Sequence, residues 1–295
     1  GYVLLGVIMS RVAKKPYWEY LDEHIFTPAG MHLIRINTEK DIVPNKAKGY
    51  IPSKEGYQHA SYVAPITNTT ADGSMLLSLE DLMAWNSTVK NKMILKRKSW
   101  NLILSPMKLN SGNNYPYGFG WFIEKKNEKT VHQHGGTWQG FTAQIFRFIE
   151  DELEVLLLTN ARSIAAYELP RKIAALINPS LKAQSLPTKP IVDEMPEITK
   201  LIREKLINIS NGKLELDDFS FIRQTVFPRI KKALISQIEG FDPPSRMELL
   251  SKEIVGDDTA LQYWVWYDDI RYRLMVSIGP NKGLTSMRLI ADRSQ

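Results

Sequence analysis

The chain has 295 residues, 43% of them hydrophobic and 24% charged, which is ordinary for a soluble globular protein and enough for two domains. It contains no cysteine, which excludes disulfides, thiol nucleophiles and Cys-bound zinc. The net charge of +6 is spread along a chain that also carries 32 acidic residues, so the sequence does not indicate a nucleic-acid partner. No phosphate-cradling glycine loop or other cofactor motif occurs, and no apolar run approaches the ~20 residues of a membrane-spanning helix.

The first third of the chain predicts two helices followed by an irregular stretch. Residues 2–12 are apolar nearly all round, which predicts a buried helix. Residues 17–25 predict a second short helix, which ends before Pro28 and Gly30. Residues 34–62 predict an irregular excursion with weak strands.

The middle of the chain predicts helices and then an antiparallel meander. Ser78 is the expected N-cap of a helix, and residues 98–104 predict another that ends at Ser105-Pro106. The expected strands are residues 117–124, 129–134, 141–149 and 153–159. A last helix, with Pro170 in its first turn, is expected to pack on the sheet.

Residues 132–141, His-Gln-His-Gly-Gly-Thr-Trp-Gln-Gly-Phe, have the pattern of an active-site edge strand. Gly135 and Gly136 have no side chain to block an approaching ligand, and residues 138–140 turn the chain back. The residues alone leave alternatives open. A strand histidine is usually structural, and His132 and His134 share a face and could bind zinc if further ligands converged.

The run His134-Gly-Gly-Thr137, followed by Gln139-Gly-Phe141, resembles the third active-site motif of the serine β-lactamase-related family. This family includes class C β-lactamases, D-alanyl-D-alanine peptidases and esterases. The resemblance implies an α+β fold with an antiparallel sheet flanked by helices. It assigns His134 as an electrostatic or proton-shuttling group and the Thr137 N–H as an oxyanion donor. It also implies substrate contacts from four residues: Gly135, Gly136, Tyr117 and Asn160.

Further segments resemble the family in the same order, so that the resemblance covers about residues 1–180. They are the helix region of residues 1–21, the turn Phe26-Thr-Pro-Ala-Gly-Met31, residues 71–85, and the strand Tyr117-Gly-Phe-Gly-Trp121. In the turn, Ala29 replaces the leucine of the family. The resemblance also implies an exported protein.

The family's Ser-x-x-Lys and Tyr-x-Asn motifs precede the segment where this chain begins. Three stretches spell Ser-x-x-Lys, starting at Ser87, Ser105 and Ser210, but all lie downstream of the family's nucleophile, and Tyr-x-Asn does not occur. We therefore interpret the chain as the C-terminal part of a serine hydrolase and expect it to be inactive alone. The alternative is a non-catalytic binding protein that retains the fold.

His134 stands where class C enzymes have a lysine, and a neutral imidazole binds a substrate carboxylate less strongly than an ammonium. The resemblance therefore favours a peptidase or esterase over a β-lactamase. The expected partner is a small molecule or peptide with a hydrolysable amide, ester or β-lactam carbonyl.

Prolines at 179, 187, 190 and 196 predict a linker over residues 181–195 between a hydrolase part, 1–180, and a small α+β domain, 196–295. The second part predicts helices at 197–209 and 226–238, and strands at 247–250, 261–267, 272–278 and 285–290. It weakly resembles accessory domains that follow some members of the family. Its aromatic residues Trp264, Trp266, Tyr267 and Tyr272 are more typical of a core than of a ligand pocket, although either is possible.

Overall fold

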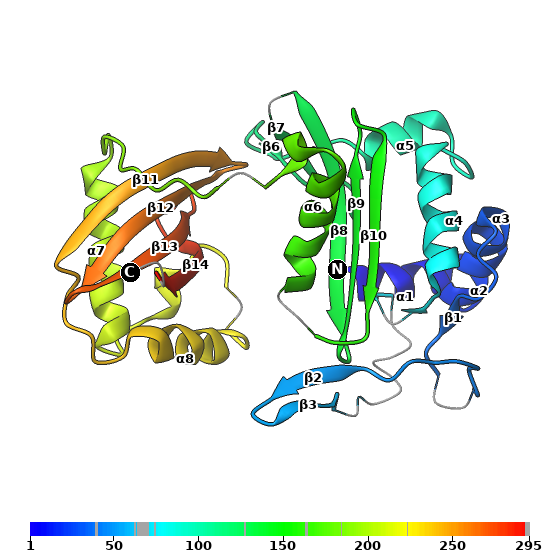
Figure 1. Cartoon of the computed structure of the whole chain (residues 1–295), viewed down its shortest axis with the longest axis horizontal. Helices are drawn as coiled ribbons and strands as arrows, with labels where there is room; N and C mark the ends of the chain where they lie inside the picture. The colour runs from blue at the N-terminus through cyan, green and yellow to red at the C-terminus, as the bar shows by residue number, and fades with distance from the viewer. Residues whose placement is uncertain are drawn as a thin grey trace. The chain divides into compact units, whose positions relative to one another are not determined.

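The computed structural model describes residues 1–38, 41–61, 63, 71–73, 75–126, 128–162, 165–183, 185–222 and 224–292 (Figure 1). The chain divides into two compact units. Unit 1 comprises Gly1–Pro106 and Pro116–Ala183, and unit 2 comprises Met107–Tyr115 and Gln184–Gln295. None of the described helices combines the length and the apolarity that crossing a bilayer requires.

Unit 1 is built on a four-stranded antiparallel sheet in the order β10-β9-β8-β7, drawn in green in Figure 1. Its strands are β7 (Phe122–Lys126), β8 (Lys129–Trp138), β9 (Phe141–Phe148) and β10 (Leu153–Thr159). Strands joined by short turns pair with their sequence neighbours because loop closure costs least there. The predicted meander over residues 129–159 is therefore confirmed, whereas the strand expected over residues 117–124 begins only at Phe122 and extends to Lys126.

Helices cover both faces of this sheet. The unit contains α1 (Tyr2–Ala13), α2 (Tyr17–Leu21), the π-helical turn η1 (Asp22–Phe26), α3 (Thr27–Ala29), α4 (Leu79–Lys90), α5 (Arg97–Ile103) and α6 (Ala165–Ile177). Successive residues of β9 point to opposite faces: Ile145 packs with Val89 of α4 and Trp100 of α5, whereas Phe146 packs with Ala174 of α6. The sheet therefore lies between two apolar layers.

The predicted N-cap at Ser78 is confirmed. Its Oγ accepts a hydrogen bond from the Asp81 N–H at 3.1 Å, and the Asp81 carboxylate accepts one from the Ser78 N–H at 3.2 Å. This reciprocal capping box satisfies two donors that the first turn of a helix leaves unpaired. It fixes the first turn of α4, and Asp81 also accepts from the Leu33 N–H at 3.0 Å.

Three helical predictions differ from the structure. The helix expected over residues 17–25 is α-helical only to Leu21, and helical turns continue through Pro28 to Ala29, because proline is tolerated in the first turn of α3. Within α1 only Gly6 is buried, and Leu4 and Ile8 are 66% and 55% exposed, so the prediction of burial was wrong. An apolar surface on all sides of a helix favours burial, but the sequence does not show which element would cover the helix. Pro170 lies in the interior of α6 rather than in its first turn, because the residues from Ala165 onward are already helical.

The excursion between α3 and α4 forms small paired strands, as predicted. They are β1 (Arg35–Ile36) with β4 (Met75–Leu76), and the hairpin of β2 (Tyr50–Ser53) and β3 (Gly56–His59). The Tyr50 N–H donates to the Asn160 carbonyl at 2.9 Å, just after β10. Residues 39, 40 and 62 of the excursion, and Ser74 before α4, lie outside the described residues.

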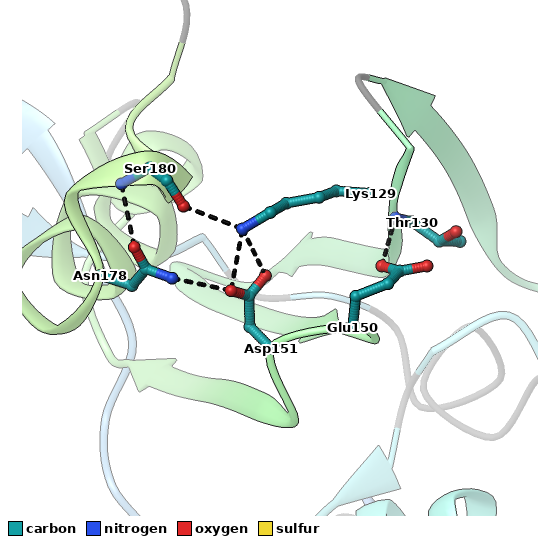
Figure 2. A network of polar contacts seen from close by, with 6 residues as sticks. All are labelled: Lys129, Thr130, Glu150, Asp151, Asn178 and Ser180. Atoms are coloured by element: carbon teal, nitrogen blue, oxygen red, sulfur yellow. Dashed lines mark hydrogen bonds and ion pairs between the residues drawn. The ribbon is translucent and has the colours of Figure 1, made fainter.

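A polar network holds the first residue of β8 (Figure 2). The Lys129 ammonium donates to both carboxylate oxygens of Asp151, at 2.9 and 3.0 Å, and to the Ser180 hydroxyl at 2.8 Å. The Asn178 amide also donates to Asp151, at 2.7 Å. Asp151 lies in the β9–β10 turn, and Asn178 and Ser180 lie at the end of α6 and in the 3-10 helix η3 (Pro179–Leu181). The network therefore joins three segments at the end of β8 that is far from His134.

Unit 2 is an antiparallel sheet packed against helices, as predicted. Its elements are α7 (Pro196–Ser210), the 3-10 turn η4 (Leu216–Asp218), α8 (Phe227–Ile238), β11 (Arg246–Val255), β12 (Asp258–Tyr267), β13 (Ile270–Ile278) and β14 (Leu284–Ala291). The sheet order is β11-β12-β13-β14. Tyr263, Val265 and Tyr267 of β12 are in the core with the helices, so Trp264 and Trp266 point to the opposite face.

The residues predicted as a linker, 181–195, make specific contacts with both units rather than lying free. Leu181 is buried in the core of unit 1. In unit 2, the Trp264 indole N–H donates to the Thr188 carbonyl at 3.0 Å, and Arg273 Nη1 donates to the Pro187 carbonyl at 2.8 Å. The Ile191 N–H donates to the Leu249 carbonyl at 2.8 Å. This proline-rich segment therefore lies along the sheet of unit 2.

A hairpin of β5 (Met107–Lys108) and β6 (Asn114–Tyr115) is counted in unit 2, although unit 1 flanks it in sequence. The Asn113 amide donates to Asp257 at 2.8 Å, and the Ser111 hydroxyl also bonds to Asp257. A Cβ at Gly256 would lie 2.9 Å from the Tyr115 ring, so the hairpin closely contacts the β11–β12 turn. A proline-rich linker can be recognised in a sequence, but no sequence pattern shows that residues 107–115 pack in unit 2.

Candidate active site

His134 lies on β8, beside the place where its pairing with β7 ends. Its Nε2 is 3.3 Å from the hydroxyl of Tyr117, and its ring stacks on Phe122, with centroids 5.8 Å apart and planes at 22°. Phe122 begins β7 opposite Gln133, and Tyr117 forms a bridge with Phe122. The turn of residues 117–121 thus brings Tyr117 to the imidazole, and its contact with a substrate stays a prediction.

Burial sets the protonation of this pair. Burial lowers the pKa of His134 below its ordinary value, so the imidazole is neutral at pH 7. Burial, with a contribution from the nearby Tyr2 hydroxyl at 3.4 Å, raises the pKa of Tyr117 to about 12. Tyr117 therefore keeps its proton and can donate it to a neutral imidazole, and the group formed by these residues is uncharged.

The backbone geometry of the β8–β9 hairpin sets the direction of the Thr137 N–H. Gln139 and Gly140 both have positive φ, 44° and 83°, as in the mirror-image turns that close two-residue hairpins. The closing pair, Trp138 and Phe141, is then hydrogen-bonded, and the next pair, Thr137 and Thr142, is not. The Thr137 N–H consequently points away from β9. The pairing of β7 ends opposite Gln133, so this N–H lies beyond the ladder between β7 and β8.

The Thr137 side chain points to the other face of the sheet from His134. Its hydroxyl is 2.7 Å from the Tyr167 hydroxyl of α6 and 3.4 Å from that of Thr142. Because residues alternate along a strand, His134 faces the layer of α4 and α5 while Thr137 is held by α6. The side chain anchors the strand and leaves the backbone N–H available at the edge.

The two glycines of the motif have different surroundings. A Cβ at Gly135 would lie 2.2 to 2.4 Å from the side-chain amide of Gln144, whereas a Cβ at Gly136 would have no neighbour within 4 Å. Gly136 is exposed, so no side chain covers this position of the strand. Gly135 makes room for a protein side chain instead.

Asn160 lies apart from His134. Its amide donates to the Lys48 carbonyl at 3.1 Å, and its own carbonyl accepts from the Tyr50 N–H. It follows β10, which is separated from β8 by β9. The structure therefore brings together His134, Tyr117 and the motif glycines, and places Asn160 where the excursion joins the sheet.

Asn37 was not singled out from the sequence, yet it supports the tip of the hairpin that carries the motif. This asparagine is 6% exposed, and its amide donates to the Gln139 side chain at 3.2 Å. Its side-chain oxygen accepts from the Lys46 ammonium at 2.6 Å. A single asparagine in an irregular stretch carries no sequence signal for such a contact.

His132, the other candidate for a zinc ligand, lies opposite Arg147 in the sheet. Burial, with a contribution from Arg147, lowers the pKa of His132 to about 4. Over the described residues, no group of three or more His, Cys, Asp or Glu side chains has the arrangement of a metal site. Arg147 occupies the cross-strand position from which a further zinc ligand would have to come, and a guanidinium does not bind a metal cation.

The three Ser-x-x-Lys serines each have a local partner. Ser87 lies late in α4 and accepts a hydrogen bond from the Asn91 amide at 3.2 Å. Ser105 donates to the Asn101 carbonyl at 2.5 Å, and Ser210 of unit 2 donates to the Ile207 carbonyl at 2.9 Å. In the part of the chain that the structure describes, no serine hydroxyl is bonded to His134.

An antiparallel sheet between helical layers, with a histidine and two glycines on the stretch of β8 that β7 does not reach, defines a β-lactamase/transpeptidase-like fold. The model of the Beta-lactamase family matches residues 1–177, and the chain belongs to this family. The expected fold class and family are therefore confirmed, and with them the description of the chain as hydrolase-related and similar to penicillin-binding proteins.

Two curated relatives match the first part of the chain. Penicillin-binding protein 4* of Bacillus subtilis (strain 168) is 27% identical over 180 residues, which cover 57% of this chain and 40% of that protein. A D-aminopeptidase of Gluconobacter oxydans (strain 621H) is 25% identical over 179 residues, which cover 60% of this chain and 33% of that protein. The chain thus spans at most two fifths of the length of these relatives.

A solved structure is similar to nearly the whole chain. The octameric penicillin-binding protein homologue from Pyrococcus abyssi aligns with 99% of this chain and 62% of its own, with a TM-score of 0.52 and 20% identity. At this identity the likeness shows the fold alone. The aligned region includes residues of unit 2 as well as those of unit 1.

Proposed function

We propose that unit 1 forms the sheet-side wall of an acyl-transfer site in a serine hydrolase of the peptidase or amidase kind. The observation that carries the proposal is the contact of Tyr117 with His134 on the strand whose Thr137 N–H points out at an unpaired edge. A neutral proton acceptor and an outward backbone donor on one strand are what an acyl transfer to a hydroxyl nucleophile requires.

In the proposed mechanism, a serine hydroxyl supplied by a Ser-x-x-Lys motif attacks the carbonyl carbon of an amide or ester. The Thr137 N–H and the N–H of the nucleophile donate to the oxyanion. His134, held neutral by burial, takes or relays the proton that goes to the leaving group, and Tyr117 orients its ring. Water then hydrolyses the acyl-enzyme.

The finer assignment is a peptidase or esterase rather than a β-lactamase. It is supported by the imidazole at 134, which is uncharged at neutral pH, where class C enzymes have an ammonium group. The relatives named as a penicillin-binding protein and a D-aminopeptidase agree with a peptide or amide substrate. The same resemblance supports an exported protein, with residues 196–295 as an accessory domain.

The test of His134 uses the protein that contains the whole family domain, with p-nitrophenyl acetate and D-alanine p-nitroanilide as substrates. We expect His134→Ala to lower kcat/KM by about 100-fold or more. The matched control is His132→Asn, on the same strand and face but with its ring buried against Arg147. Turnover that is unchanged in His134→Ala, or equally reduced in both variants, would reject the role.

A second test addresses the proposal that the 295-residue chain is inactive alone. We expect no covalent labelling of this chain by a serine-directed fluorophosphonate, and labelling of a larger natural product. A labelled serine within the chain would overturn the proposal. A natural product with a mass near 33.8 kDa that hydrolyses neither substrate would favour the non-catalytic binding protein.

A further inference from the structure

Unit 2 contains a cavity of about 290 Å³ on the face of its sheet that is opposite to α7 and α8. Trp264 lines this cavity with two arginines of β13, Arg271 and Arg273. Leu186 of the proline-rich segment and Ile290 of β14 supply apolar walls. The cavity therefore combines an aromatic ring, two guanidinium groups and aliphatic side chains, all from unit 2.

Arg271 already has a carboxylate partner. Its Nε and Nη2 both donate to one oxygen of Asp292, at 2.9 and 2.5 Å, and its guanidinium carbon is 4.3 Å from the centre of the Trp264 ring. An arginine that is stacked on an aromatic ring and bonded to a carboxylate is held in one orientation. The charge of Arg271 is thus balanced within the protein.

Arg273 differs from Arg271, although it contacts the same ring at 4.2 Å. The residue is only 7% exposed, and its Nη1 donates to two neutral acceptors, the Pro187 carbonyl at 2.8 Å and the Gln262 side chain at 3.2 Å. Within the described residues no carboxylate forms an ion pair with Arg273, and Asp292, which is bonded to Arg271, acts on the Arg273 charge only from a greater distance. Buried charges are normally paired with an opposite charge, and this one faces a cavity.

We propose that this cavity binds a small organic carboxylate, with the carboxylate on the Arg273 guanidinium and the apolar part against Leu186 and Ile290. Among the described residues that line the cavity, Arg271 and Arg273 contribute two positive charges and Asp292 one negative charge, which favours a monoanion. The volume lies at the lower end of ligand pockets, which fits a molecule of the size of benzoate rather than a polypeptide segment. This site is independent of the proposed chemistry at His134.

The direct test is isothermal titration calorimetry of the full chain with benzoate, and with benzamide as its neutral isostere. We expect benzoate to bind with a dissociation constant of about 1 mM, and benzamide at least about tenfold more weakly. Absence of benzoate binding, or equal binding of benzamide, overturns the proposal. Phenyl phosphate tests whether the site prefers a carboxylate or a phosphate. Tighter binding of phenyl phosphate than of benzoate would overturn the assignment of a carboxylate.

Variants locate the site. We expect Arg273→Gln to weaken benzoate binding at least about tenfold, and the matched control Arg288→Gln, an exposed arginine of β14 that does not line the cavity, to leave it unchanged. Because Arg273→Gln also removes a bond to the Pro187 carbonyl, Ile290→Glu is the second variant. It keeps Arg273 and places a competing carboxylate in the cavity from a partly exposed position, and it should abolish binding. Binding that survives Ile290→Glu, or that falls equally in Arg288→Gln, contradicts the proposed site.

Discussion

The side-chain amide of Gln144 occupies the space into which a Cβ of Gly135 would project, with atoms 2.2 to 2.4 Å from that position. The two residues are cross-strand partners in β8 and β9, and Gln144 is 2% exposed. A Cβ at Gly135 would therefore displace the buried end of the Gln144 side chain, on the face of the sheet opposite to His134. The contact with Gln144 distinguishes Gly135 from Gly136, two adjacent glycines that the sequence pattern alone does not distinguish.

This contact predicts opposite outcomes for two neighbouring substitutions. Gly135→Ala should lower the free energy of unfolding by about 1–3 kcal/mol, because the buried Gln144 amide must shift. Gly136→Ala, whose Cβ meets open space, should change it by less than about 0.5 kcal/mol. Urea denaturation of both variants measures this difference. Equal destabilisation of the two variants would show that backbone conformation, and not Gln144, decides the outcome. The double variant Gly135→Ala with Gln144→Ala should recover part of the stability lost in Gly135→Ala.

The contact between Tyr117 and His134 predicts a separation of two effects in Tyr117→Phe. The pKa of His134 should stay below its ordinary value of 6.5, because burial and not the hydroxyl is what lowers it. The nitrogen chemical shift of Nε2 should change, because its hydrogen-bond partner is removed. A pH titration followed by NMR of labelled histidine reads out both. A return of the pKa to 6.5 in the variant would contradict this account.

His132 predicts a specific loss of stability in acid. Its pKa falls from 6.5 to about 4 on folding, chiefly by burial and secondarily through Arg147, whereas Glu150 acts in the opposite direction. Between these values the unfolded chain binds the proton more readily, so the contribution of this group is fully present above pH 6.5 and is lost as the pH falls toward 4. The loss should reach about 3 kcal/mol.

The measurement is the free energy of unfolding from pH 7.5 to 4 for the protein and for His132→Asn. Other groups contribute to the slope of both proteins, so the difference between the two curves isolates this imidazole. The variant should have the shallower curve below pH 6.5. Parallel curves would mean that His132 is protonated as readily in the folded as in the unfolded chain.

The network at the start of β8 predicts a large effect from Asp151→Ala. The substitution leaves the Lys129 ammonium and the Asn178 amide without a shared acceptor, and should cost about 2 kcal/mol of stability (Figure 2). The control is Glu168→Ala, which removes an exposed pair with Lys172 and should cost less than about 0.5 kcal/mol. Thermal unfolding compares them, and similar midpoints for the two variants would show that the network contributes little.

The sequence predicted the strands around His134 because alternation and glycine-rich turns are local properties of the chain. The capping box at Ser78 was predictable for the same reason, since all its atoms come from four consecutive residues. The family resemblance predicted that Tyr117 borders the cleft, and the structure adds the contact with the imidazole. The assignment of Asn160 as a substrate contact stays a prediction, although its bonds are to the excursion.

Features that depend on contacts distant in sequence could not be predicted. The support of Gln139 by Asn37 joins residues 102 positions apart, and no pattern marks either as a partner. The apolar character of α1 predicted burial, which the structure does not show. Trp264 was one of several strand aromatics, and only the fold reveals that it faces away from the core with Arg271 and Arg273 beside it.

The hairpin of β5 and β6 affects how the protein can be divided. The chain passes between the units after Pro106, Tyr115 and Ala183, so a single protease cut just after Ala183 gives two fragments, and the first fragment keeps the hairpin that packs in unit 2. Deletion of everything beyond Ala183 would in turn remove Gly256 and Asp257 from the hairpin and expose more of Leu109 and Tyr115 to solvent. Limited proteolysis at that point should therefore yield fragments that stay associated, and shortened versions of the protein are best cut elsewhere.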